Sequence, residues 1–258
     1  MTLPDLTVLT YERRGPVGWL TMNRPEQMNA MSRAFWPELR AVLADVSADP
    51  DVRVLVVHGA GRCFSVGGDI SSFEGIVDAG SRRAFSDECL RTLRAVEELP
   101  QPTIAAVHGW ALGGGCELTM VCDIVVADET ATFGMPESAV GLVPGLGVVR
   151  GRAHVNLHWL KYLVFTGERL DATTARQVGL VNVVTPPGDH LAEAERLAGL
   201  VAAKAPLAVA AAKRILGRGS DDGYGHSTEM IAMLHGTVDQ VEGVRAFLEK
   251  RQPRFTGT

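Results

Sequence analysis

Short apolar runs and longer stretches with helical spacing take turns along the first two thirds of the chain. Apolar and polar residues alternate on both sides of Gly15-Pro16, which predicts a two-stranded hairpin over residues 7–14 and 17–23. Runs of β-branched and small apolar residues, typical of buried strands, follow at three places: residues 52–58, 103–107 and 124–127.

Helical spacing separates these runs, with apolar residues three and four positions apart. Ser32 can cap a helix that reaches residue 46, and Pro100 ends a second helix over residues 81–99. Residues 70–80 mix Ser, Gly and Asp without periodicity and predict a loop. The later elements are expected in this order: a helix from the glycines at 113–115 through residue 121, helices at 147–165 and 173–178, and a strand at 180–184.

The pattern changes near Asp189, after which the chain becomes almost continuously helical and rich in alanine. Strands that alternate with helices, followed by helices alone, indicate an α/β fold with a helical appendage. We therefore expect two regions. A βα core over residues 1–188 would carry the site, and residues 189–258 would form a C-terminal helical region.

Composition narrows the class of protein. The 258 residues are 46% hydrophobic and carry a net charge of −5 without a dense run of Lys and Arg, so nothing favours a nucleic-acid partner. No apolar run reaches the ~20 residues that a membrane span needs, and the first residues lack a secretory signal pattern. Four cysteines without CxxC spacing are typical of reduced thiols. We expect a soluble, cytoplasmic protein that binds neither membrane nor nucleic acid.

Two glutamates in apolar, glycine-rich surroundings are the strongest candidates for chemistry. Glu117 ends the run Trp110-Ala-Leu-Gly-Gly-Gly-Cys-Glu117, and Glu137 ends Phe133-Gly-Met-Pro-Glu137. A carboxylate in such a setting loses hydration, and the usual remedies are a partner or the raised pKa that acid–base chemistry near neutrality needs. Taken singly, Glu117 can instead be a first-turn residue that stabilises a helix dipole, and Glu137 an exposed loop residue.

Two glycine-rich turns follow predicted strands and can supply backbone N–H groups. Gly113, Gly114 and Gly115 open a helix, where unsatisfied N–H groups and the helix dipole favour an anion or oxyanion. The turn at residues 63–69 can add the second donor that an oxyanion hole uses. Each turn also has an ordinary alternative: a tight turn that needs positive φ at glycine, and an Asx turn or cap at Asp69.

Other motifs argue against other chemistries. No Walker A sequence occurs, and no G-x-G-x-x-G run follows a strand, so ATP and dinucleotides are disfavoured. His154 and His158 have the i, i+4 spacing of metal ligands, but a zincin glutamate and a third ligand are missing, which favours packing or surface roles. Ser65 lacks the G-x-S-x-G flanks of a nucleophile elbow. The sequence predicts no metal site.

An ordered set of motifs resembles the crotonase superfamily, the enoyl-CoA hydratase/isomerase fold, along essentially the whole chain. The motifs are Asn23-Arg-Pro25 with Asn29-Ala30, Phe64-Ser-Val-Gly-Gly-Asp-Ile70, residues 104–118, Cys122-Asp123, Phe133-Gly-Met-Pro-Glu137, Gly141-Leu-Val-Pro-Gly145, Thr166-Gly167, Ala175-Arg-Gln-Val-Gly-Leu-Val181 and Phe247-Leu-Glu-Lys-Arg251. The resemblance implies a crotonase-like spiral of ββα turns for the core. It also implies that the C-terminal helical region serves trimerisation, in homotrimers that commonly pair into homohexamers.

The resemblance further implies roles for single residues. The backbone N–H groups of Val66 and Gly114 would form the hole for a thioester oxygen, and the residues that match Glu117 and Glu137 are both catalytic in the hydratases of this family. CoA is the handle on the acyl-CoA substrate, and neither a metal nor a redox cofactor is needed. The substrate or CoA contacts implied by the resemblance are Arg24, Ser65, Gly67, Asp69, Ile70 and Gly113.

Retention of both glutamates favours an enoyl-CoA hydratase, which adds water across the C2=C3 bond of a 2-enoyl-CoA and gives a 3-hydroxyacyl-CoA. Glu117 would act as base toward the water that attacks C3, and Glu137 would deliver a proton to C2. One alternative is another crotonase enzyme, namely a Δ3-Δ2-enoyl-CoA isomerase, a hydrolase or a decarboxylase. A second alternative is a non-catalytic acyl-CoA-binding scaffold, which would have no need of two buried carboxylates.

The chain departs from the family pattern after the second glutamate. Leu146-Gly-Val-Val-Arg-Gly-Arg152 replaces the common Gly-Gly-Thr-Gln-Arg character, and Arg150 and Arg152 bring positive charge close to Glu137. Val66 stands where alanine is more usual, and its branched side chain can reshape the acyl pocket. These departures bear on the substrate and the reaction rather than on the fold.

Overall fold

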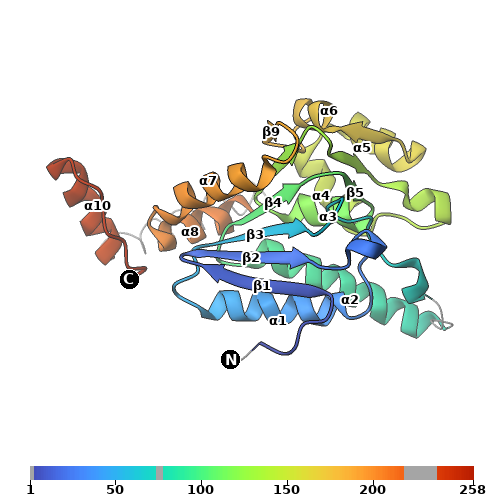
Figure 1. The fold of residues 1–258 in the computed structure, drawn as a ribbon, viewed down its shortest axis with the longest axis horizontal. Helices are drawn as coiled ribbons and strands as arrows, with labels where there is room; N and C mark the ends of the chain where they lie inside the picture. Colours follow the sequence, from blue (N-terminus) through green and yellow to red (C-terminus); the bar gives the residue numbers. More distant parts are fainter. Residues whose placement is uncertain (1–2, 74–77, 218–236) are drawn as a thin grey trace.

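A six-stranded sheet runs through the middle of the computed structural model, which describes residues 3–73, 78–217 and 237–258 (Figure 1). The first two strands form the expected antiparallel hairpin, and the remaining neighbours pair in parallel. In spatial order the strands are β1 (Leu9–Arg14), β2 (Val17–Met22), β3 (Val54–Gly59), β4 (Thr103–Val107), β6 (Ile124–Asp128) and β9 (Val183–Thr185).

Helices cover both faces of this sheet, which explains why the central strands are apolar along most of their length. Val54 and Val56 pack with Ala194 and Ala198 of α7 (His190–Ala202). The alternate residues of β3 join the larger core on the other face, where α1 (Phe35–Ala48) and α2 (Ala79–Glu98) lie below the sheet in Figure 1. Side chains that alternate along a strand therefore meet helices on both sides.

A second, three-stranded sheet was not predicted. It consists of β5 (Trp110–Leu112), β7 (Thr132–Gly134) and β8 (Arg169–Asp171), with β5 and β7 parallel and β8 antiparallel to β7. Three residues are too few for a strand period to be recognised in a sequence. This small sheet carries the candidate site.

The remaining elements are helical and connect or cover the sheets. They are η1 (Pro25–Gln27), η2 (Ile70–Phe73), α3 (Gly114–Val121), η3 (Pro136–Val140), α4 (Gly147–His154), α5 (Leu157–Thr166), α6 (Ala172–Gln177), α8 (Pro206–Leu216) and α10 (Val238–Glu249). The α/β class and the crotonase-like architecture expected from the motifs are confirmed, because solved structures reported below share this fold.

Several boundaries differ from the predictions. The strand expected over residues 180–184 is the shorter β9, which begins three residues later. The single helix expected over residues 147–165 is two helices, because the chain becomes extended at Val155 and Asn156 caps α5 by accepting from His158 N at 2.9 Å. Ser32 caps no helix, since α1 begins at Phe35 after Ala34. The expected loop at residues 70–80 contains η2 and the capped start of α2, and its residues 74–77 lie outside the described chain.

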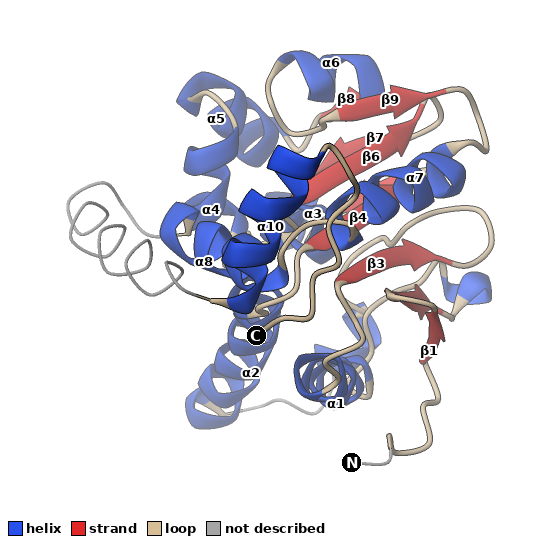
Figure 2. Cartoon of the chain, turned by 90° about the vertical axis from the view of Figure 1, so that its left-hand side faces the viewer, coloured by secondary structure: helices blue, strands red, loops and turns tan. Residues whose placement is uncertain are grey.

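The C-terminal part divides into a packed helix and a separate one. Helix α7 lies on the large sheet (Figures 1 and 2), whereas α10 stands away from the body of the molecule (Figure 1). Four large apolar residues on α10 are at least half exposed: Val238, Val241, Val244 and Leu248. The division into regions 1–188 and 189–258 stays a prediction, with a core-covering helix directly after its boundary.

No helix in the described ranges has the length and apolar character to cross a membrane.

Candidate active site

Two neighbouring parallel strands deliver the two glutamates. Strand β5 leads through Gly113 into α3, whose first turn carries Glu117. Strand β7 leads through one residue into η3, which carries Glu137. Gly113 N donates to Gly134 O at 2.9 Å, so the two strand ends are joined where the chains leave the sheet. The carboxyl ends of parallel neighbours meet at one edge of a sheet, and this pairing brings both acids there.

The buried side chain of Glu117 lies against the N-terminus of α4. Its side chain is 8% exposed, and Oε1 accepts hydrogen bonds from Leu146 N at 2.8 Å and Gly147 N at 2.7 Å. These are the first N–H groups of α4, which have no partner within the helix itself. Burial raises the pKa of Glu117, and the two amide donors act in the opposite direction by stabilising its ionised form.

Glu137 has a different environment. Its Oε1 lies against Gly113, 3.2 Å from the point where a Cβ on that residue would stand. Its Oε2 is buried and has no hydrogen-bond partner among the described residues. Burial, and after it the charge of Glu117, raise the pKa of Glu137 to about 7. Burial, and after it the charges of Glu137 and Glu117, raise the pKa of Cys116, which stands beside both carboxyl groups.

The two acids therefore differ in what their surroundings stabilise. Two N–H donors stabilise the ionised form of Glu117, whereas burial and an oxygen without a partner among the described residues favour the protonated form of Glu137. Two titratable groups whose surroundings separate their pKa values form an acid and base pair. This arrangement can take a proton at one carboxyl group and give one at the other.

The raised pKa of Glu137 has a consequence for stability. A folded-state pKa of about 7 against 4.5 means that the native chain binds this proton more tightly than the unfolded chain. The resulting stabilisation is full below pH 4.5 and is lost as pH rises through about 7. From pH 5 to 8, we expect Glu137→Gln to lose less unfolding free energy than the wild type, by roughly 1–2 kcal/mol after discounting for partial exposure. Urea unfolding at both pH values measures this difference, and an equal loss in both proteins would contradict it.

The two glycine turns lie against each other. Ser65 N donates to Trp110 O at 2.8 Å, and Leu112 N donates to Ser65 O at 2.9 Å, so the turn at residues 63–69 runs beside β5. At Gly67, which has φ +89°, an added Cβ would lie 2.7 Å from Gly114 N. Only glycine allows this close approach, which brings the turn at residues 63–69 against the start of α3.

The two expected donors differ in their bonding. Gly114 N–H opens α3 and has no acceptor within the described chain. Val66 N–H donates to Met28 O at 3.2 Å. One donor is thus available to a ligand, and the other is already engaged with a carbonyl group of the chain.

The residues expected near CoA divide into supporting and exposed groups. Arg24 Nη1 lies 2.8 Å from Asp69 Oδ2, and Asp69 Oδ1 accepts from Ser71 N and Oγ in the Asx turn considered as its alternative. Ser65 is fully buried, and its hydroxyl donates to Asn29 O, so this side chain supports the turn from inside. Ile70 is 68% exposed beside them and can contact a ligand directly.

Two groups at the site were missed by the sequence interpretation. The amides of Leu146 and Gly147 bind Glu117, and no feature of the sequence indicates this role. Asn29, with φ +55°, is buried and donates to Ala60 O and Cys63 O at 2.8 Å each, which joins two loops under the site. A buried Asn in a left-handed turn is a local signal that can be looked for.

The single helix expected to carry both His154 and His158 is divided in the structure. His154 ends α4 and His158 lies in α5, so the two residues do not share a helix face. In the described ranges, no group of three or more His, Cys, Asp or Glu side chains is arranged to hold a metal ion.

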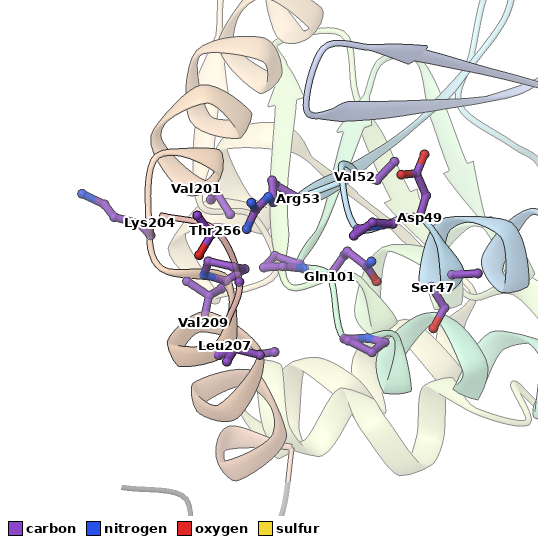
Figure 3. A pocket seen from close by; sticks show the side chains of 17 residues that line it. Ser47, Asp49, Val52, Arg53, Gln101, Val201, Lys204, Leu207, Val209 and Thr256 are labelled. Carbon is purple, nitrogen blue, oxygen red and sulfur yellow. The ribbon is translucent and has the colours of Figure 1, made fainter. Parts of the chain in front are cut away.

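Two clefts differ in their relation to the glutamates. One of about 990 Å³ lies between α2, α4 and α8, and its wall includes Gly145 and Leu146, next to Glu117. A smaller one of about 240 Å³, lined by Arg53, Gln101 and Thr256 among others, lies at the amino ends of β3 and β4 (Figure 3). The first cleft therefore adjoins the candidate site, and the second contains none of the predicted site residues.

Known proteins are similar to this chain in both sequence and fold. A family model described as Enoyl-CoA hydratase/isomerase matches residues 12–258. A short-chain-enoyl-CoA hydratase of Clostridium acetobutylicum is 34% identical over 254 residues, covering 96% of this chain and 97% of that protein. A crotonyl-CoA hydratase of Syntrophomonas wolfei is 35% identical over 253 residues, with the same coverage. The crystal structure of an enoyl-CoA hydratase from Bacillus anthracis superposes with a TM-score of 0.92 at 31% identity, covering 98% of this chain and 100% of that one.

Proposed function

Because this chain belongs to the enoyl-CoA hydratase/isomerase family, the crotonase superfamily, we propose that it hydrates a 2-enoyl-CoA thioester. It is a hydro-lyase of the enoyl-CoA hydratase type, and its substrate is an acyl-CoA. The observation that carries the proposal is the pair of shielded carboxyl groups: Glu117 accepts two backbone N–H donors, and burial raises the pKa of the half-buried Glu137 to about 7.

The reaction begins with charge on the substrate carbonyl. When water attacks C3, the electrons of the C2=C3 bond move toward the thioester oxygen, which becomes an enolate. The N–H groups of Gly114 and Val66 would stabilise that oxygen, and the close approach of Gly67 to Gly114 N supports this assignment. Fixed donors aimed at developing charge lower a barrier effectively because they need no reorganisation during the reaction.

The proton transfers use the two glutamates in opposite directions. Glu117 takes a proton from water as its oxygen bonds to C3, and Glu137 gives its proton to C2 as the enolate collapses. The product is a 3-hydroxyacyl-CoA, and the pair then exchanges one proton to return to its starting state. The scheme uses water and groups of the chain and needs no metal or redox cofactor.

A direct assay separates hydration from the other reactions of the family. Crotonyl-CoA is the first substrate to test, because a relative at 35% identity carries the name crotonyl-CoA hydratase. Loss of the enoyl absorbance with formation of 3-hydroxybutyryl-CoA supports the proposal. No hydration of crotonyl-CoA or longer enoyl-CoA thioesters, together with release of free CoA or conversion of a 3-enoyl-CoA, would favour a hydrolase or an isomerase instead.

The rate is expected to depend on pH in a specific way. Activity needs Glu117 ionised and Glu137 protonated, so kcat/KM should follow a bell whose alkaline side falls near pH 7. The two limits belong to the coupled pair rather than to either residue alone. Initial rates with crotonyl-CoA from pH 5 to 9 measure the profile. A rate that keeps rising above pH 8 would contradict the role of Glu137 as the acid.

We also propose that the chain assembles into a homotrimer, or a homohexamer of paired trimers, in the cytoplasm. The exposed apolar residues on α10, a helix that stands away from its own core, support association with other copies. The four free cysteines agree with a reducing compartment. Sedimentation velocity at micromolar concentration tests the assembly, and a monomer there would contradict it.

A further inference from the structure

An ion pair joins α4, whose first N–H groups bind Glu117, to α2. One turn after Leu146 and Gly147 donate to Glu117, Arg150 pairs with Glu97 of α2. Their side chains are 30% and 21% exposed, and Arg150 Nε is buried. This pair is therefore better shielded from solvent than an ordinary surface ion pair, whose contribution is small.

The ion pair lies close to the turn that binds Glu117, on α4 as well as on α2. Arg150 N donates to Leu146 O at 2.8 Å, so the arginine and the donor turn lie on one face of α4, separated by a single turn. On α2, Leu90 packs at Gly145 and stands seven residues before Glu97, which places both on one face of that helix. Helix α2 thus supports α4 at two points, at the donor turn and at the arginine.

We propose that the ion pair between Arg150 and Glu97 is a positioning device that holds the N-terminus of α4 on Glu117. The inference rests on the proposed function, in which Glu117 is the base. The pair keeps the two amide donors within hydrogen-bonding distance of Oε1 and so keeps the carboxylate ionised and correctly aimed. Arg150 is a positioning residue, because it touches Glu97 rather than the reacting atoms.

Arg150 influences Glu117 by positioning α4, and not through its own charge. Three influences act on Glu117: burial, Gly147 N–H and Leu146 N–H. The other titratable groups facing it are Glu137 from η3, Cys116 from α3 and Cys89 from α2. The charge of Arg150 is felt instead by His154, at the far end of α4. Moving the helix would therefore change Glu117 through its two donors.

The test compares the pH profile of variants that break and rebuild the pair. In Arg150→Met and Glu97→Gln, we expect kcat to fall about tenfold, because small displacements of catalytic groups have large effects on rate. The acid side of the kcat/KM profile should move up by about one pH unit, the shift for weakening one hydrogen bond to a charged acceptor. Arg150→Lys and the exchanged pair Glu97→Arg with Arg150→Glu should restore much of both. Circular dichroism establishes that each variant folds, and Glu97→Gln is the milder substitution if Arg150→Met does not.

Arg152 provides a matched control on the same helix. It is exposed and makes no ion pair within the part of the chain that is described, and its charge is not among the influences on Glu137, contrary to the expectation from the sequence. Arg152→Met should therefore leave both kcat and the profile unchanged. An unchanged acid limit in the folded Arg150 and Glu97 variants, or no recovery in the exchanged pair, would overturn the proposal. Failure of the proposed function looks different, because full activity in Glu117→Gln refutes the base itself whatever the Arg150 variants do.

Discussion

Replacing Glu117 or Glu137 by glutamine is expected to lower kcat for the hydration of crotonyl-CoA by about 10²–10⁴-fold. Glutamine keeps the size of the side chain and one oxygen acceptor, so Leu146 N–H and Gly147 N–H can still be bonded at position 117. It can neither take a proton from water nor give one to carbon at neutral pH. The loss should therefore appear in kcat, as measured by initial rates at saturating substrate.

A control acid separates this loss from a general effect of charge. Glu129 is exposed at a turn, and Glu129→Gln should keep the activity of the wild type. Thermal unfolding followed by circular dichroism should show that all three variants remain folded. Wild-type turnover in either Glu117→Gln or Glu137→Gln would remove the basis for the two-carboxylate scheme.

The second large effect is expected at Gly67. In Gly67→Ala the new methyl group would stand 2.7 Å from Gly114 N and 2.6 Å from Leu112 O, distances that real side chains do not adopt. The turn must move away from α3, and the amide donors of Val66 and Gly114 would separate. Loss of one donor from an oxyanion hole lowers kcat by about 10²–10³-fold, and we expect a decrease of this size.

Gly15→Ala is the matched control for backbone strain. Gly15 also has positive φ, +59°, but nothing lies within 4 Å of its added Cβ. Both variants should lose on the order of 1 kcal/mol of stability from the left-handed conformation. Activity should fall in Gly67→Ala and stay unchanged in Gly15→Ala. An equally active Gly67→Ala would show that the close approach of the two turns is not needed for the reaction.

The positions of the glutamates were predictable because each glutamate follows a recognisable sequence pattern. A buried strand and a glycine turn precede Glu117, and a Phe-Gly-Met-Pro stretch precedes Glu137. These local patterns fix where the side chains leave the small sheet. The hairpin was predictable from alternating apolar and polar residues, and the central strands from apolar runs that helices cover on both faces.

Backbone groups and distant pairs were not predictable. The amides that hold Glu117 belong to Leu146 and Gly147, whose side chains say nothing about what their N–H groups bind. Arg150 pairs with Glu97 from a helix much earlier in the chain, a contact that only the packing of α2 on α4 creates. The capping role expected of Ser32 was wrong because a cap depends on where the chain turns, not on residue type alone.

The bond from Val66 N–H to Met28 O bears on how the site distinguishes substrate from transition state. A neutral thioester oxygen must compete with a peptide carbonyl of similar strength, so exchanging one acceptor for the other gains little affinity. An enolate oxygen carries far more negative charge and wins that competition clearly. The occupied amide would thus strengthen discrimination in favour of the enolate, which raises turnover rather than tightening the grip on unreacted substrate.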